Sequence, residues 1–174
     1  MTTKSIYESA AAIIKVLKKK SLSISVAESI TGGGVGHALT SIPGSSEVFV
    51  GGVIAYSDQL KVDLLDVEKK VIKKHTPCSE EVAIQMAVGI QRATGSDYAI
   101  ATTGVAGPGK AYGFKSGTVW VGIATPPESK TPPFAFLLEI SASAPGLTTV
   151  QRREEIRNTS ITSALAAFER ILLS

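Results

Sequence analysis

The chain has 174 residues, of which 44% are hydrophobic and 19% charged, and its formal net charge at pH 7 is +3. This length and composition predict one globular domain over residues 1–174 with a core of its own, and they exclude fibrous and disordered classes. No apolar run approaches the roughly 20 residues of a membrane span, so we expect no membrane contact. The single cysteine, Cys78, cannot form an internal disulfide, which favours a reducing, cytoplasmic setting.

The positive charge could indicate a nucleic-acid partner, but its distribution argues against one. Lysines gather at residues 18–20 and 69–74, and neither cluster is interleaved with aromatic side chains. Both clusters are predicted to mark solvated ends of helices, where cations interact favourably with the helix dipole.

The N-terminal third predicts a strand–helix–strand unit. Apolar residues recur at helical spacing over residues 6–17, and "SLSISVAES" (21–29) then alternates as a strand does. "TGGGVGHALTSI" (31–42) predicts a helix, and "VFVGGVIAY" (48–56) is a nearly continuous apolar run typical of a buried strand. The order predicts a parallel crossover.

The rest of the chain continues the alternation of helices and strands. Ser57 is the expected N-cap of a short helix through Leu65, and Ser79 is the expected N-cap of a longer one through Arg92. Three strands and a final helix are predicted at residues 97–103, 117–125, 134–140 and about 147–172. The fold class is therefore α/β, a single layered α/β/α domain with a mixed, partly parallel sheet of about five or six strands.

In such sheets, chemistry collects beyond the carboxyl ends of the parallel strands. The first stretch at such a place is "AESITGGG" (27–34), where small residues could let an anionic ligand approach bare backbone N–H groups. The alternative is that the glycines only permit close packing of strand and helix.

The second stretch is "ATTGVAGPGKAYGF" (101–114), which approaches the spacing of a nucleotide-triphosphate P-loop. Ala111 stands where that motif needs a hydroxyl for magnesium, and the loop leads into a strand where a helix is required. An ATP or GTP site is therefore not expected. A loop around a smaller ligand and a plain surface turn both remain open.

The third stretch (42–61) offers the hydroxyls of Ser45, Ser46 and Tyr56 together with Lys61, and no histidine. A lysine can serve as a base when it is neutral, and both desolvation and a helix N-terminus lower a lysine pKa. The alternative is an exposed lysine without a catalytic role.

Several separate motifs resemble one family. "AESITGGGVGHALTSIPGSSEVFVGGVIAYSDQLK", "TTGVAGP" and "SGTVWVGIAT" are similar to the C-terminal domain of CinA proteins, the nicotinamide-nucleotide amidohydrolase family, in its stand-alone form. The resemblance implies hydrolysis of the carboxamide of nicotinamide mononucleotide to nicotinate mononucleotide and ammonia, without metal or other cofactor. It also implies a small-molecule nucleotide substrate and a homo-oligomer.

The family's site positions fall on compatible residues here. The resemblance implies a nucleophile at Ser46, with Ser29 as its rival, a base at Lys61 and a relay or acid at Tyr56. Substrate contacts are expected at the following residues: Thr31, Gly32, Gly33, Thr103, Gly104, Gly107, Arg153 and Arg157. Arg153 is expected to pair with the 5′-phosphate.

The sequence departs from the family most clearly at "GPGKAYGFKSG", where members usually carry "GPGGGS" or "GPDGGS", acidic residues and "KPVG". If this loop closes over the nucleotide, the departure predicts a different or weaker ligand contact. The competing prediction is a nucleotide-binding homologue that has lost turnover.

Overall fold

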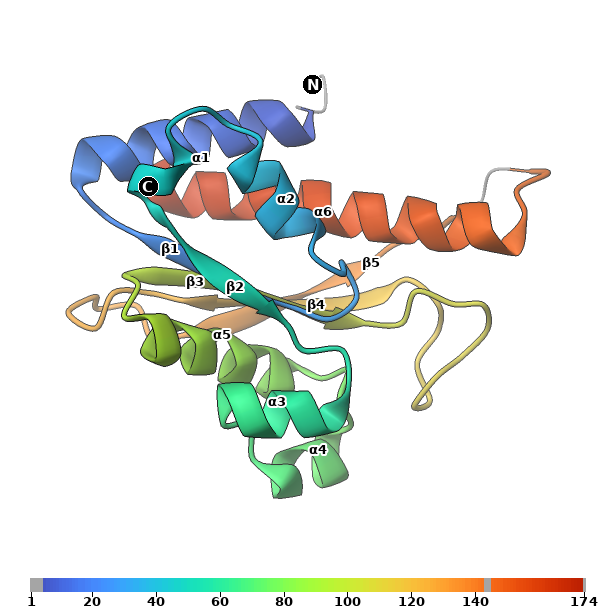
Figure 1. Ribbon diagram of the computed structural model, residues 1–174. Coiled ribbons are helices and arrows are strands. Elements are labelled where there is room, and N and C mark those ends of the chain that lie inside the picture. Colours follow the sequence, from blue (N-terminus) through green and yellow to red (C-terminus); the bar gives the residue numbers. More distant parts are fainter. Residues whose placement is uncertain (1–4, 143–144, 174) are drawn as a thin grey trace.

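A computed structural model describes residues 5–142 and 145–173. Its elements follow the expected alternation, and the α/β prediction is confirmed (Figure 1). They are α1 (Ile6–Lys20), β1 (Ile24–Glu28), α2 (Gly34–Thr40), the 3-10 helix η1 (Ser45–Glu47), β2 (Phe49–Ile54), α3 (Asp58–Leu65), α4 (Lys69–His75), α5 (Glu80–Thr94), β3 (Tyr98–Gly104), β4 (Thr118–Ala124), β5 (Phe134–Glu139) and α6 (Thr149–Leu173).

The described strands form one mixed sheet in the order β2-β1-β3-β4-β5. β1 pairs in parallel with β2 and β3, while β3–β4 and β4–β5 are antiparallel. The sheet is thus parallel first and then meanders, as predicted. Because β1, β2 and β3 run in the same direction, the segments that leave their carboxyl ends emerge at one edge of the sheet.

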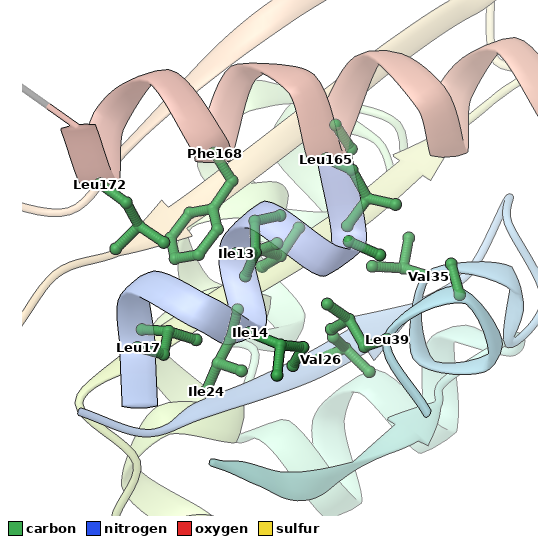
Figure 2. Close-up of a cluster of buried hydrophobic side chains, with 14 of the residues drawn as sticks. Ile13, Ile14, Leu17, Ile24, Val26, Val35, Leu39, Leu165, Phe168 and Leu172 are labelled. Atoms are coloured by element: carbon green, nitrogen blue, oxygen red, sulfur yellow. The ribbon is translucent and has the colours of Figure 1, made fainter. Parts of the chain in front are cut away.

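Helices cover both faces of the sheet, with α1, α2 and α6 on one side and α3, α4 and α5 on the other (Figure 1). Figure 2 shows the first layer, in which side chains of α6 and α1 meet those of β1 and α2. Phe168 of α6 is fully buried there, and its ring meets the Tyr98 ring edge to face at 5.3 Å between centroids. On the other side, Met86 of α5 and Leu65 of α3 belong to a second buried cluster.

Local chemistry explains where the helices begin. Ser5 and Glu8 form a capping box at α1, with Glu8 N–H donating to Ser5 Oγ at 3.2 Å and Ser5 N–H donating to a Glu8 carboxylate oxygen at 2.6 Å. Ser57 and Ser79 cap α3 and α5 with their hydroxyls, as expected from the sequence.

The structure differs from the sequence prediction in the start of the second helix and in one additional helix. The second helix begins at Gly34 instead of residue 31, because Gly32 and Gly33 have positive φ angles of 59° and 93° that a right-handed helix cannot contain. The lysines at 69–74 belong to α4, a helix that the sequence analysis did not predict. No helix among the described residues is long and apolar enough to cross a membrane.

Candidate active site

A cavity of about 210 Å³ lies where the chain leaves the three parallel strands. Its walls come from the segments after β1 and β2, the start of α3, the segment before α5, the end of β3 with the β3–β4 loop (residues 105–117), and one residue of α6. The lining residues are Ser29, Ile30, Tyr56, Asp58, Lys61, Pro77, Cys78, Thr103, Gly104, Val105, Ala106, Gly107, Pro108, Ala111, Tyr112 and Arg153.

Lys61 is the most unusual member of this lining, because only 2% of a lysine side chain is exposed. Its ammonium lies 3.5 Å from the Tyr56 carbonyl oxygen and 3.7 Å from an Asp58 carboxylate oxygen. Burial lowers the pKa of Lys61, and the nearby Asp58 and Cys78 oppose that shift without cancelling it. The alternative of an exposed lysine is thereby excluded, and the neutral amine is favoured more than in a solvated lysine.

Tyr56 and Arg153 join β2 to α6 at the mouth of the cavity. Arg153 donates one hydrogen bond to the Tyr56 hydroxyl at 2.9 Å and another to the Gly107 carbonyl at 2.6 Å. The Tyr56 hydroxyl is therefore engaged by Arg153, and the contact between Tyr56 and Lys61 runs through the tyrosine's backbone carbonyl. Two of the five N–H donors of the guanidinium are used in these bonds.

Thr103 and Cys78 form a buried polar pair on the floor of the cavity. The Thr103 hydroxyl donates to the Pro77 carbonyl at 2.7 Å, so its one hydrogen is committed and it faces other groups as an acceptor. Burial raises the pKa of the Cys78 thiol, although Thr103 and Lys61 act in the opposite direction. Cys78 is therefore a thiol rather than a thiolate, and a poor nucleophile.

The two candidate serines are far apart within one chain. Ser29, largely buried, follows β1 and lines the cavity with Lys61. Ser46 is exposed in η1, before β2, whereas Lys61 follows the other end of that strand. A six-residue strand spans on the order of 20 Å, so a single chain does not bring Ser46 to Lys61.

The N–H groups of Gly33 and Gly34 at the start of α2 are hydrogen-bonded within the protein. The buried Glu28 carboxylate accepts hydrogen bonds from Gly33 N–H at 2.9 Å, Val35 N–H at 3.1 Å and Gly36 N–H at 2.8 Å. The anionic group expected at this helix start is thus a side chain of the protein itself. Neither Gly32 nor Gly33 lines the cavity, and their substrate contacts stay a prediction.

Thr31 and Arg157 also lie outside the cavity lining, and both have structural partners. The fully buried Thr31 shares a hydrogen bond of 2.6 Å with the Thr102 hydroxyl. Arg157 donates to the Ile30 and Thr31 carbonyls at 3.2 and 3.0 Å, so it fastens α6 to the turn after β1. Both residues hold the turn that carries Ser29 in place, and their predicted contacts with substrate stay predictions.

Sequence reasoning missed three titratable residues of the cavity lining, Asp58, Cys78 and Tyr112. Asp58 stands three residues before Lys61 on the same helix, a spacing that could have suggested their ion pair. Cys78 and Tyr112 approach from segments distant along the chain, and no local pattern pointed to them. Among the described residues, no group of three histidine, cysteine, aspartate or glutamate side chains could hold a metal ion.

A second cavity, of about 330 Å³, adjoins the first. The two share Ala106, Pro108 and Arg153, and the second is also lined by Arg152 and Ser116. Arg153 therefore stands at the boundary between a cavity with a buried lysine and a cavity with a second arginine.

Comparison with known proteins identifies relatives over nearly the whole chain. The family model described as the CinA C-terminal domain matches residues 6–172. A competence-damage inducible protein of Clostridium botulinum (strain Langeland) is 39% identical over 161 residues, which are 92% of this chain and 36% of that protein. A CinA-like protein of Synechococcus sp. (strain RCC307) is 51% identical over 100 residues, 58% of this chain and 24% of that one. The chain thus spans about a quarter to a third of the length of these curated relatives.

Solved structures share the whole fold. The competence/damage inducible protein CihA from Agrobacterium tumefaciens superposes with a TM-score of 0.85 at 28% identity, covering 100% of this chain and 99% of that one. A competence-damaged protein (CinA) superfamily protein from Escherichia coli gives a TM-score of 0.86 at 25% identity, covering 100% of this chain and 93% of the other.

Proposed function

Since the chain belongs to the CinA C-terminal domain family, we propose that it hydrolyses the carboxamide of nicotinamide mononucleotide to nicotinate mononucleotide and ammonia. The observation that carries this proposal is the buried Lys61, whose lowered pKa favours a neutral amine in a cavity that also holds Ser29. A neutral amine next to a hydroxyl is what a serine–lysine amidase requires.

In the proposed reaction, Lys61 takes the proton of the Ser29 hydroxyl as its oxygen attacks the carboxamide carbon. The C–N bond then breaks, and Lys61 returns the proton to the departing nitrogen, which leaves as ammonia. Lys61 then deprotonates a water molecule that attacks the acyl-serine ester, and it returns this proton to the Ser29 oxygen as the ester C–O bond breaks and the carboxylic acid, which ionises to nicotinate, is released. Apart from substrate and water, these steps use side chains of the protein.

The nucleotide would lie with its ring toward Lys61 and its phosphate toward Arg153. Arg153 suits a phosphate because its planar guanidinium presents several N–H donors in a fixed fork. It lines both cavities, so a ligand longer than a pyridine ring can extend past it into the second cavity. Thr103, Gly104 and Gly107 line the first cavity and are proposed to contact the ligand there.

Ser46 requires a different arrangement, in which a second copy of the chain supplies it. β2 is an edge strand, and its Val50 and Ile54 side chains are each about half exposed. Antiparallel pairing of two such edges would bring the η1 of one copy toward the end of β2 in the other. A shared site of this kind is the second candidate, and it accords with the proposed homo-oligomer.

The test measures ammonia release from nicotinamide mononucleotide by purified variants. Ser29→Ala and Lys61→Ala are expected to lower kcat by about 10³-fold or more, the scale seen when a nucleophile or its base is removed. Ser41→Ala and Lys73→Ala, which change exposed side chains, serve as matched controls and should retain wild-type turnover. A Lys61→Ala protein with full activity would refute the mechanism.

Mixing experiments distinguish the two serines. If Ser46 acts across a subunit boundary, inactive Ser46→Ala and Lys61→Ala proteins should regain activity when they are refolded together. If Ser29 acts within one chain, Ser46→Ala remains active by itself and mixing adds nothing. Wild-type protein that is stabilised by nicotinate mononucleotide but releases no ammonia would favour the binding homologue.

A further inference from the structure

The β3–β4 loop ends in a tight two-residue turn that contains a tyrosine. Ala111 N–H donates to the Phe114 carbonyl at 3.1 Å, and Phe114 N–H donates to the Ala111 carbonyl at 2.9 Å. The two residues between them, Tyr112 and Gly113, have φ angles of 54° and 84°. Positive φ at both central positions is the signature of a type I′ turn, which strongly prefers asparagine, aspartate or glycine.

Tyr112 has no structural reason to occupy this position. A bulky side chain at positive φ is strained, because its Cβ approaches the backbone more closely than in the right-handed region. The side chain is 58% exposed, so its burial offsets little of that strain. Within the described part of the chain, no hydrogen bond engages its hydroxyl. Because contacts of the Tyr112 side chain with the described residues offset little of this backbone strain, we expect the residue to serve function rather than stability.

The location of Tyr112 suggests that role. It lines the cavity that contains Lys61, and Tyr56 lines the same cavity. Asp58, Cys78 and Tyr56 line this cavity together with Tyr112. Burial raises the pKa of Tyr112, and these three groups add to that shift.

The same arginine fixes both tyrosine-bearing segments. Arg153 binds the Tyr56 hydroxyl and also the Gly107 carbonyl, at the base of the loop that carries Tyr112. The loop is closed a second time where Gly117 N–H donates to the Val105 carbonyl at 2.7 Å. Tyr112 thus lies in a hairpin whose base is held by the hydrogen bonds of Arg153 and Gly117.

We propose that Tyr112 is a specificity-determining residue that packs its ring on the planar ring of a bound mononucleotide, with Tyr56 as a second aromatic wall of the cavity. This inference rests on the proposed function insofar as it identifies that ring as the pyridine of nicotinamide mononucleotide. Aromatic side chains stack on nucleotide rings because both partners offer flat, polarisable faces.

Binding measurements test this directly, because the informative variant is not expected to damage the fold. Tyr112→Gly removes the ring and suits the turn better, so its melting temperature should equal or exceed that of the wild type. Tyr112→Phe keeps the ring and removes the hydroxyl. Lys110→Ala changes an exposed loop side chain outside the cavity lining and is the matched control.

Calorimetry would compare nicotinate mononucleotide, adenosine monophosphate and ribose 5-phosphate, which has no ring base. Tyr112→Gly should weaken binding of nicotinate mononucleotide by about tenfold, the scale of one lost aromatic stack, and leave ribose 5-phosphate unchanged. Tyr112→Phe and Lys110→Ala should bind as the wild type does. With nicotinamide mononucleotide as substrate, KM should rise in Tyr112→Gly more than kcat falls.

The outcomes separate this inference from the proposed function. Equal binding of nicotinate mononucleotide by wild type and Tyr112→Gly would overturn the role of Tyr112 while leaving the amidase proposal intact. A wild type that releases no ammonia but binds either ringed mononucleotide through Tyr112 would support the inference without the activity. A wild type that binds neither ringed mononucleotide would overturn the role of Tyr112, and if it also releases no ammonia from nicotinamide mononucleotide, the amidase proposal would be overturned as well.

Discussion

Replacing Lys61 with methionine should stabilise the protein while abolishing turnover. The ammonium is buried, and its compensation is weak: the Tyr56 carbonyl lies 3.5 Å away and the Asp58 carboxylate, itself about half exposed, 3.7 Å away. Methionine keeps most of the aliphatic stem in place and removes the charge. Lys61→Met therefore retains the packing and loses the poorly compensated cation.

The expected size follows from these contacts. Loss of a long, half-exposed ion pair costs about 0–1 kcal/mol. Replacing buried charged groups by apolar ones of similar volume is often neutral or stabilising by about 1–4 kcal/mol. We expect a net gain of about 1–3 kcal/mol, and for a chain of 174 residues each kcal/mol raises the melting temperature by about 2–4 °C.

The lowered pKa of Lys61 also predicts how the stability difference between Lys61→Met and the wild type changes with pH. The pKa of Lys61 is lower in the folded than in the unfolded protein, so between these two values the unfolded chain binds more protons and wild-type stability rises with pH. Below the folded pKa the cost of the buried ammonium is fully present. The advantage of Lys61→Met should therefore be largest below the folded pKa of Lys61 and shrink as the pH rises toward the pKa of an unfolded lysine.

Urea denaturation of both proteins at several pH values, together with ammonia release, is the assay. Lys73→Met, which changes an exposed lysine of α4, is the control and should alter stability by less than about 0.5 kcal/mol. A Lys61→Met protein that is less stable than the wild type at neutral pH, with the same pH slope, would refute the reasoning about the buried charge.

Three further predictions concern the framework of the site. Glu28→Gln should cost about 2–4 kcal/mol in urea denaturation, because an amide cannot accept from all three N–H groups at the start of α2, whereas Glu47→Gln on the surface should cost under about 1 kcal/mol. Gly122→Ala should lower the melting temperature by several degrees, because the new Cβ would clash with a backbone carbonyl of α5. Gly36→Ala is the control: its Cβ would make ordinary contacts, so the free energy of unfolding should be unchanged or rise by up to about 1 kcal/mol. Phe168→Ala should cost about 3–5 kcal/mol by calorimetry, and a smaller loss would mean that the layer shown in Figure 2 closes over the gap.

Periodicity and caps were enough to predict the layered domain. Ser57 and Ser79 predicted two helices through local hydrogen bonds, and the apolar run of residues 48–56 predicted the strand β2. The prediction that this strand is buried was wrong, because β2 lies at the edge of the sheet and its Val50 and Ile54 side chains are about half exposed. The edge of the sheet that carries the cavity was also predictable, because parallel strands must end on the same side. α4 was missed because only two of its seven residues, Val71 and Ile72, are apolar, which is too few to show helical periodicity.

The burial, hydrogen bonding and mutual distances of the site residues depend on how other parts of the chain pack around them. The pattern of small residues around Gly33 did not indicate that the Glu28 carboxylate accepts a hydrogen bond from the Gly33 N–H group. Arg157 binds the carbonyl of Thr31, which lies 126 positions earlier in the chain. Ser46 and Lys61 are close in sequence, but a straight strand between them holds them apart. The amino-acid sequence indicates which backbone conformation a segment prefers and which face of a helix or strand is apolar. Whether a lysine is desolvated, a hydroxyl is within reach or an N–H is free depends on atoms that only folding assembles around it.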